Sequence, residues 1–158
     1  SAAAALFLDD RPDKPIRERM ITEWDSSCCL LALRDGRIIK IPEGPLILPS
    51  VTIQGICALA RERGIPVEER PVAYGELINW VQEDSVVTIC SIGTAGILNR
   101  CSELKLVDEQ LNPIAIHKQD STHELTVALA ELRQEYWSIY TGERDVPESL
   151  SFDVYSLN

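Results

Sequence analysis

Apolar and polar positions alternate at the start of the chain in a pattern that predicts an antiparallel meander. Apolar runs over 5–8 and 16–22 are separated by a charged turn that contains prolines. Two further runs, over 28–33 and 37–41, flank Asp35-Gly36, a dipeptide typical of tight hairpin turns. We therefore expect consecutive strands joined by short connections.

A helix is expected after the proline-containing segment 42–49. Ser50 is a favourable N-cap residue, apolar side chains recur with helical spacing over 51–63, and Gly64 can end the helix. Downstream, the pattern predicts a strand over 67–72, a short helix over 74–82, a buried strand over 86–92 and an extended segment over 97–107. Because strands and helices alternate without a repeat or a long linker, the expected fold class is α/β (α+β) in one domain.

The last part of the chain is expected to contain one long helix. Ser121-Thr122-His123-Glu124 has the spacing of a capping box, and Gly142 can end the helix. The apolar positions of this helix recur at helical spacing, at Leu125, Leu129, Leu132, Tyr136 and Ile139. Alternating apolar residues over 150–154 predict a final strand.

Composition and charge indicate a globular domain and exclude some classes of binding partner. The 158 residues are 45% hydrophobic and 25% charged, which is typical of a globular domain with its own core. The net charge of −10 repels phosphate backbones and anionic lipids, so neither nucleic acid nor a membrane is an expected partner. The 5 cysteines are an odd number and include the adjacent pair Cys28 and Cys29, so we expect thiols in a reducing compartment such as the cytoplasm.

Common catalytic and metal-binding motifs are absent from the sequence. It contains no P-loop, GxGxxG, paired CxxC, HExxH or GxSxG motif. Its histidines are expected to be solvated side chains, His117 in a loop and His123 in the first turn of the last helix. No metal site is therefore expected.

Two segments instead suggest a site for an anion. The string Leu48-Pro49-Ser50-Val51-Thr52 opens a helix, and a helix start presents unpaired N–H groups at the positive end of the helix dipole. The turn Gly93-Thr94-Ala95-Gly96 follows a buried strand and offers a hydroxyl and further amides. Together they favour a phosphate-bearing ligand over the alternative of an ordinary N-cap and an ordinary turn. Glu23, at the end of a strand, is on its own most simply a surface charge.

The order of these motifs resembles a known family. The sequence over about 6–107 is similar to the large, C-terminal domain of class IV (fold type IV) pyridoxal-phosphate-dependent aminotransferases, which include branched-chain and D-amino-acid aminotransferases and aminodeoxychorismate lyase. The matching strings are 6–9, Ile21-Thr22-Glu23 with Ser26-Ser27, 33–37, 47–52, Ala58-Leu59-Ala60, 64–70 and Gly93-Thr94-Ala95. The resemblance implies mixed sheets in a pseudo-barrel flanked by helices.

The resemblance also implies roles for individual residues. Glu23 matches the carboxylate that pairs with the pyridine nitrogen of pyridoxal 5'-phosphate and keeps that nitrogen protonated. Leu48 matches the residue that packs on the ring face. The phosphate is expected to be bound by the helix-start amides of Val51 and Thr52 and by the hydroxyl of Thr94. Further cofactor-binding residues implied by the matching strings are Ser27, Gly93 and Ala95.

Several family features are missing from the sequence. The lysine that holds the cofactor, an arginine for its phosphate and a small N-terminal domain all precede the Glu23 position in the family. The lysines here match none of these positions; they are Lys14, Lys40, Lys105 and Lys118. Because the sequence also lacks an initiator Met, we expect 1–158 to be the C-terminal cofactor-binding domain, with the lysine on a preceding segment or a separate chain.

Three substitutions relative to the family leave the substrate open. Ser50 replaces a usual glycine, Ile53 a frequent arginine and Cys28 a frequent asparagine. Cys28 is expected to be a small buried apolar residue because no basic residue is near it in sequence. The string 23–27 is closer to the D-amino-acid and amine branch of the family than to the branched-chain branch.

The expected function is pyridoxal-phosphate-dependent transamination. An amino acid or amine would be converted to a keto compound, with a keto acid as acceptor, and family members imply a homodimer. A lyase of the aminodeoxychorismate lyase type is one alternative. The other is a cofactor-free binding or structural relative that has lost the catalytic lysine.

Overall fold

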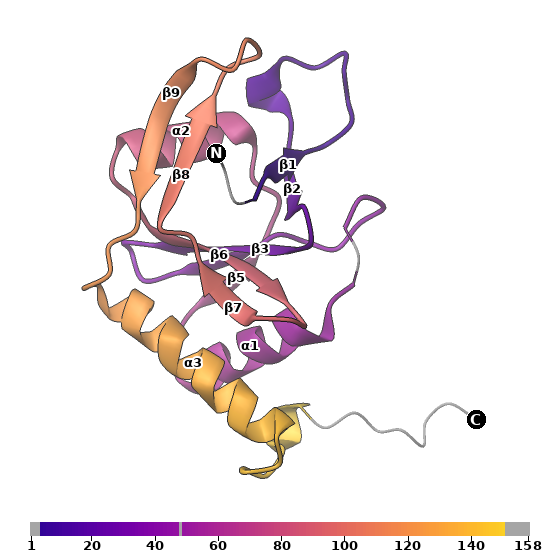
Figure 1. Ribbon diagram of the computed structural model, residues 1–158, viewed down its shortest axis with the longest axis vertical. Coiled ribbons are helices and arrows are strands. Elements are labelled where there is room, and N and C mark those ends of the chain that lie inside the picture. Colours follow the sequence, from indigo (N-terminus) through magenta and orange to yellow (C-terminus); the bar gives the residue numbers. More distant parts are fainter. Residues whose placement is uncertain (1–3, 48, 151–158) are drawn as a thin grey trace.

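Seven strands of one sheet form the centre of the computed structural model, which describes residues 4–47 and 49–150 (Figure 1). These strands are β1 (Leu6–Leu8), β2 (Ile21–Trp24), β3 (Ser27–Leu33), β4 (Ile38–Lys40), β5 (Val67–Glu69), β6 (Val86–Gly93) and β7 (Ile97–Arg100). A hairpin of β8 (Glu103–Val107) and β9 (Pro113–Lys118) forms a second sheet. The helices are α1 (Val51–Glu62), α2 (Tyr74–Gln82) and α3 (Glu124–Tyr140), with 3-10 turns η1 (Ile16–Glu18) and η2 (Glu148–Leu150).

Strand β3 is the central strand of the large sheet and pairs with three other strands. Along one edge it pairs with β6 over residues 28–33. Along the other edge it pairs first with β2, at Ser27 and Cys28, and then with β4, at 30–32. All pairings are antiparallel except that of β4 with β5, so the sheet is mixed. The expected mixed α/β fold class is confirmed.

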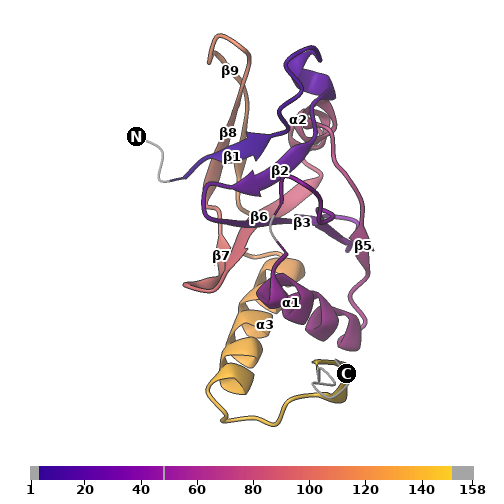
Figure 2. The same cartoon turned by 90° about the vertical axis from the view of Figure 1, so that its right-hand side faces the viewer.

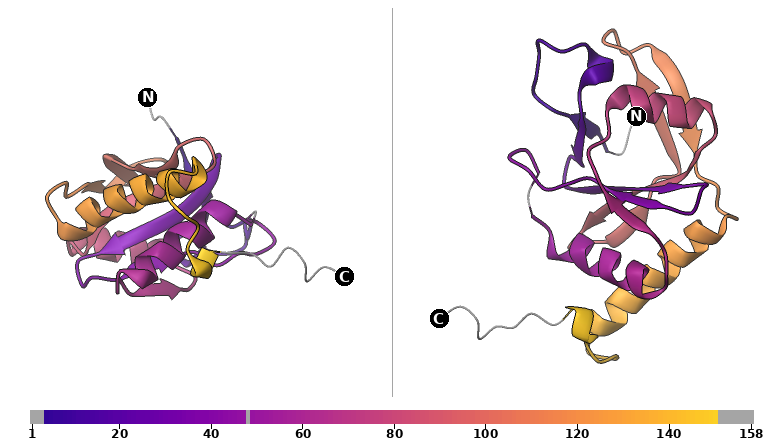
Figure 3. Two further views of the ribbon diagram at one scale, coloured as in Figure 1. Left: turned by 90° about the horizontal axis from the view of Figure 1, so that it is seen from below. Right: turned by 180° about the vertical axis from the view of Figure 1, so that it is seen from behind.

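The two faces of β3 carry two separate cores. Cys28, Leu30 and Ala32 face one cluster, and the alternate residues of the strand, Cys29, Leu31 and Leu33, face the other. This alternation follows from the two-residue period of a strand, and because both faces are covered, nearly every position of β3 is apolar. Helices α1 and α3 cover the first face, while α2 and the β8–β9 hairpin cover the second (Figures 2 and 3).

Several local predictions are confirmed. Gly36 adopts φ 96° in the turn between β3 and β4, where an L side chain is disfavoured. The Ser50 Oγ accepts a hydrogen bond from the N–H of Ile53 and so caps α1, and Gly64, at φ 76°, follows its end. Helix α2 and strand β6 also lie where the pattern placed them.

Other boundaries differ from the prediction, in each case because of a contact distant in sequence or a neighbouring turn. The expected strand over 16–22 is wrong: Pro15 begins the 3-10 turn η1, and β2 starts only at Ile21. The expected strand over 67–72 ends at Glu69. The segment 97–107 divides into β7 and β8 because its two halves pair in different sheets.

The end of the chain requires three further corrections. Strand β9 was not expected, and His117 lies in it, 4% exposed, instead of in a solvated loop. Burial lowers the pKa of His117, and its Nε2 has no hydrogen-bond partner among the described residues. His123, not Ser121, caps α3, because its Nδ1 accepts from the N–H of Leu125 at 3.1 Å. Of the expected strand over 150–154, Leu150 belongs to η2 and the rest lies outside the described residues.

Asp9 forms a partly buried ion pair with Arg11 that makes stability depend on pH. Hydrogen bonds from the Arg11 side chain, opposed by burial and assisted by the N–H of Met20, lower the pKa of Asp9 from 3.8 to about 2. A carboxylate with a depressed folded-state pKa contributes stability above its unfolded pKa and loses it as the pH falls through the folded pKa.

We expect Asp9→Asn to lower the free energy of unfolding at neutral pH and to remove the part of the pH dependence that falls between about pH 4 and about pH 2. Urea unfolding of parent and variant across that range measures the difference. Asp10→Asn is the control, since Asp10 is exposed. Parallel stability curves for parent and Asp9→Asn would contradict the expectation.

Candidate functional site

The predicted site residues on three strands lie at one end of the large sheet. Glu23 on β2 is directly opposite Cys28 on β3, and Cys28 is in turn opposite Ile92 on β6. Gly93 ends β6 close to Ser27: a Cβ at Gly93 would be 3.3 Å from the Cβ of Ser27. Strand pairing thus brings together Glu23, Ser27 and Gly93, although the last two are far apart in sequence.

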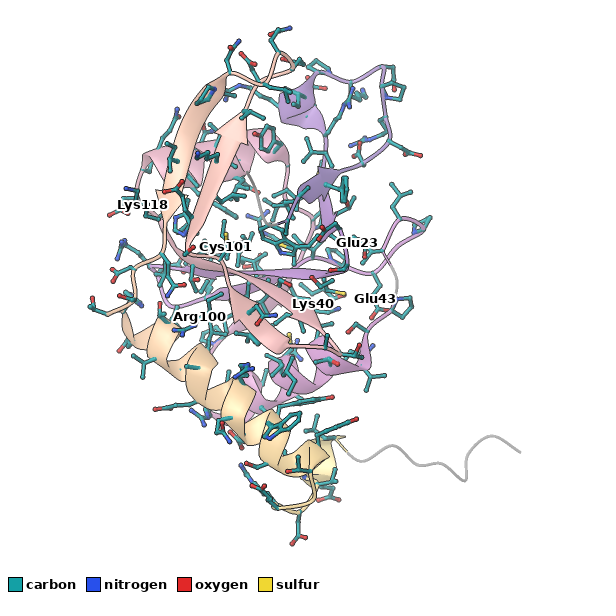
Figure 4. The ribbon with its side chains drawn as sticks, in the orientation of Figure 1. Glu23, Lys40, Glu43, Arg100, Cys101 and Lys118 are labelled. Carbon is teal, nitrogen blue, oxygen red and sulfur yellow. The ribbon has the colours of Figure 1, made fainter. Side chains whose placement is uncertain are left out.

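The Glu23 carboxylate is half-buried and available for a ligand. It projects from the end of β2, beside the start of β3 (Figure 4). Within 4–47 and 49–150, no residue forms a hydrogen bond or an ion pair with it. Other carboxylates of the chain are paired, for example Asp9 with Arg11 and Glu76 with Arg70. An unpaired, partly desolvated carboxylate is a suitable partner for a cationic group.

Cys28 connects Glu23 to the start of α1. Its side chain is 8% exposed, which confirms the predicted burial. Burial raises the pKa of the Cys28 thiol, and a hydrogen bond with the Ser50 side chain acts in the opposite direction. Because Ser50 caps α1, the first turn of that helix lies near the β2–β3 end of the sheet.

The start of α1 has the properties of an anion site. No described residue accepts a hydrogen bond from the N–H of Val51 or Thr52. The Val51 side chain is 62% exposed, whereas Thr52 and Ile53 are buried. Two amides at the positive end of the helix are therefore open to an anion. Leu48, the predicted ring-packing residue, lies outside the described residues.

The turn after β6 lies against the same core. Ile92 and Ile97, which flank the turn, belong to one apolar cluster with Cys28 and Ile53. Thr94 and Ala95 at the tip of the turn are exposed. A hydrogen bond of 2.5 Å between the hydroxyls of Ser27 and Ser91 ties β3 to β6 just before the turn. The two proposed anion-binding elements and Glu23 therefore surround the same end of the sheet.

The lysines differ in their surroundings. Lys14 is exposed in its turn, as predicted, and Lys105 and Lys118 are exposed on the β8–β9 hairpin. Lys40 on β4 is 5% exposed, opposite Leu30, and its Nζ lies 3.2 Å from the Oε1 of Glu69. This ion pair directs the Lys40 ammonium toward β5. The burial of Lys40 has no local sequence signal, because it depends on α1 covering this face of the sheet.

Three other kinds of feature are absent from residues 4–47 and 49–150, namely a metal-binding cluster, a membrane-spanning helix and a disulfide. No group of three or more histidine, cysteine, aspartate or glutamate residues is arranged to hold a metal ion within that part of the chain. No helix in it is both long and apolar enough to cross a bilayer. None of the 5 cysteines, all of which lie in the described ranges, forms a disulfide.

Comparison with known proteins identifies similar sequences. No family model matches the chain. A probable branched-chain-amino-acid aminotransferase of Staphylococcus aureus (strain N315) is 26% identical over 137 residues, which cover 87% of this chain and 34% of the relative. One from Staphylococcus epidermidis is 25% identical over 125 residues, which cover 79% of this chain and 32% of the relative. The chain therefore spans about a third of the length of the curated relatives that it matches.

Solved structures show the same fold. The branched-chain amino acid aminotransferase of Thermobaculum terrenum in its PLP form has a TM-score of 0.60 at 24% identity, covering 89% of this chain and 38% of that structure. The Escherichia coli branched-chain amino acid aminotransferase has a TM-score of 0.61 at 18% identity, with 90% and 40% covered. A Brucella abortus aminotransferase bound to the cofactor PLP has a TM-score of 0.54 at 20% identity, with 74% and 35% covered.

These sequence and structure matches agree with the motifs from which the resemblance was inferred. Over most of its length, the chain resembles the class IV, fold type IV pyridoxal-phosphate-dependent aminotransferases, and it has their fold.

Proposed function

We propose that this chain binds pyridoxal 5'-phosphate at the Glu23 end of the large sheet and contributes to transamination. When bound, this cofactor supplies an electron-accepting ring for the electrons left when the substrate's α-proton departs. Glu23 would hold the ring nitrogen protonated, and the N–H groups of Val51 and Thr52 with the Thr94 hydroxyl would bind the phosphate. Ser27, Gly93 and Ala95 would line the same site.

The observation that supports this proposal best is the half-buried Glu23 carboxylate, which no described residue pairs. A carboxylate of this kind fits a protonated pyridine nitrogen, because the cation compensates the cost of partial desolvation. The unpaired N–H groups at the start of α1 fit the dianionic phosphate, because they donate hydrogen bonds at the positive end of the helix dipole. The residues present therefore match both charged ends of the cofactor.

The complete active site would need a lysine from elsewhere. Lys40 is the buried lysine of this chain, but its ion pair with Glu69 occupies its ammonium. We therefore propose that 1–158 acts as the C-terminal cofactor-binding domain and that the lysine comes from a preceding segment or a separate chain. A homodimer, a small amino donor and a keto-acid acceptor are part of the same proposal, and the matched relatives carry the branched-chain name.

Two alternatives follow from the same observations. A lyase of the aminodeoxychorismate lyase type would use the same cofactor contacts. A cofactor-free binding or structural relative is the second alternative.

Visible absorbance of the complete protein with added pyridoxal 5'-phosphate tests the proposal. We expect a visible absorption band from the bound cofactor, and cofactor that stays on the protein after borohydride reduction. No band and no retained cofactor would leave only the cofactor-free alternative. Formation of a new amino acid from an added keto-acid acceptor indicates transamination, whereas release of pyruvate with no acceptor present, from an amino-substituted ring substrate, indicates elimination.

Thr94→Val is expected to weaken cofactor binding by about 1–2 kcal/mol, the contribution of one hydrogen bond to a charged group. Because Thr94 is exposed, its substitution should leave the fold intact. Equilibrium dialysis against pyridoxal 5'-phosphate measures the change. Thr94→Ser, which keeps the hydroxyl, is the matched control and should bind as the parent does. Equal affinity of Thr94→Val and parent would remove Thr94 from the site.

A further inference from the structure

A groove between the edge strand β7 and helix α3 lies outside the Glu23 site. Its volume is about 400 Å³, and Figure 4 shows Arg100 between the two elements. The residues that line it are Leu98, Asn99, Arg100, Gln119, Ala130 and Arg133. In the β6–β7 ladder Arg100 is opposite Cys90, whereas the Thr94 turn follows Gly93. Three strand residues, roughly 10 Å of strand length, therefore separate Arg100 from the turn that contains Thr94, whereas the other end of the groove reaches that turn at Leu98, which is opposite Ile92.

The groove contains positive charge that the chain does not neutralise. The whole chain has a net charge of −10, and several arginines elsewhere, such as Arg37, Arg63 and Arg70, pair with carboxylates, whereas others, such as the exposed Arg61, pair with none in the described part of the chain. Neither Arg100 nor Arg133 forms an ion pair with any residue in 4–47 or 49–150. No carboxylate is among the lining residues. Two unneutralised guanidinium groups in one groove of an acidic protein are the feature to be explained.

Backbone carbonyls orient both arginines toward this groove. The Nη1 of Arg100 donates to the carbonyl of Thr126 at 3.5 Å, and the Nε of Arg133 donates to the carbonyl of Gly96 at 3.1 Å. A neutral carbonyl fixes the direction of a guanidinium without cancelling its charge. Because a guanidinium has five N–H donors, each arginine keeps further donors for a ligand.

The turn at Gly96 also positions a third polar group of the groove. The Asn99 side chain occupies the space that a Cβ at Gly96 would need, so a larger residue at position 96 would displace the Asn99 amide. Gly96 thus permits the position of Asn99 and supplies the carbonyl that orients Arg133. The amides of Asn99 and Gln119 add neutral hydrogen-bonding groups to the lining of the groove.

We propose that the β7–α3 groove binds a small organic anion that carries phosphate or carboxylate groups. Arg100 and Arg133 would donate charge-assisted hydrogen bonds to its anionic group, and the amides of Asn99 and Gln119 would contact its polar remainder. The lining residues of the groove are distinct from those of the proposed pyridoxal phosphate site, and the hydrogen bond from Arg133 to the carbonyl of Gly96 attaches the groove to the turn that contains Thr94.

Isothermal titration calorimetry on the complete protein tests this proposal, with pyrophosphate and citrate as the phosphate and carboxylate probes. One series of titrations contains saturating pyridoxal 5'-phosphate and the other contains none. A probe that binds at the start of α1 is blocked by the cofactor, so its binding is lost in the series with the cofactor. We expect saturable binding of at least one probe in both series. The probe that binds more tightly identifies the anion chemistry.

Single variants locate the binding. Arg100→Gln and Arg133→Gln are each expected to lower the affinity for the probe at least about tenfold, which corresponds to the loss of one charge-assisted hydrogen bond. Arg61→Gln removes the same charge from an exposed position in the last turn of α1 and should leave affinity within about twofold. Thermal unfolding of each variant verifies that the fold is intact.

Two results would overturn the proposal. One is the absence of saturable binding by either probe. The other is an equal loss of affinity in Arg61→Gln and in the groove variants, which would indicate a diffuse charge effect.

Discussion

Glu23→Gln is expected to lower turnover about 1,000-fold while the protein still binds pyridoxal 5'-phosphate. Removing one group that stabilises the charge of a transition state lowers the rate by about this factor. A neutral amide accepts a hydrogen bond but does not hold the ring nitrogen as a cation. The ring would therefore accept electrons less readily, and removal of the α-proton would slow. Single-turnover absorbance measurements separate this step from cofactor binding.

The control for Glu23→Gln is a variant with the same charge change elsewhere. Glu83, the C-cap residue of α2, is exposed, and Glu83→Gln should leave turnover unchanged. Glu23→Asp, which keeps the charge on a shorter side chain, should be intermediate. Parent-like turnover in Glu23→Gln would remove Glu23 from the proposed role, even if the cofactor is bound.

The second large effect is expected in the core. Leu30→Ala should lower the free energy of unfolding by about 3 kcal/mol, because a buried leucine loses both its transfer free energy and its packing contacts. Leu30 is fully buried at the centre of β3, where that strand pairs with both β4 and β6. Urea unfolding, monitored by circular dichroism, measures the change as a shift of the urea concentration at the unfolding midpoint. The slope of free energy against urea concentration should stay the same.

Phe7→Ala is the matched control for Leu30→Ala. Phe7 lies on strand β1, is 49% exposed, and should change stability by about 1 kcal/mol or less. The difference between the two variants tests whether β3 is the central strand of the fold. Equal losses, or a Leu30→Ala protein as stable as the parent, would contradict that assignment.

The candidate site was predictable in its parts because its signals are local. Ser50 caps α1 through a bond to a residue three positions away, and the turn after β6 follows a continuous apolar run. The strings that contain Glu23 and Thr94 carried the family resemblance, which the matched relatives and structures support. The roles of Glu23, Ser27, Val51, Thr52, Gly93, Thr94 and Ala95 stay predictions until the variants are measured. The substrate branch also stays a prediction, although the matched relatives carry the branched-chain name.

The sequence by itself determined the hairpin at Gly36, the limits of α1, the class of fold and the apolar character of β3, because each depends on residues close together in the chain. Only the tertiary structure decided that Glu23 lies near Gly93, that Lys40 and His117 are buried, and that Arg100 and Arg133 share a groove. The physical reason is that burial and proximity come from strand pairing and helix packing between distant segments. A residue's own neighbours in sequence do not specify those long-range contacts.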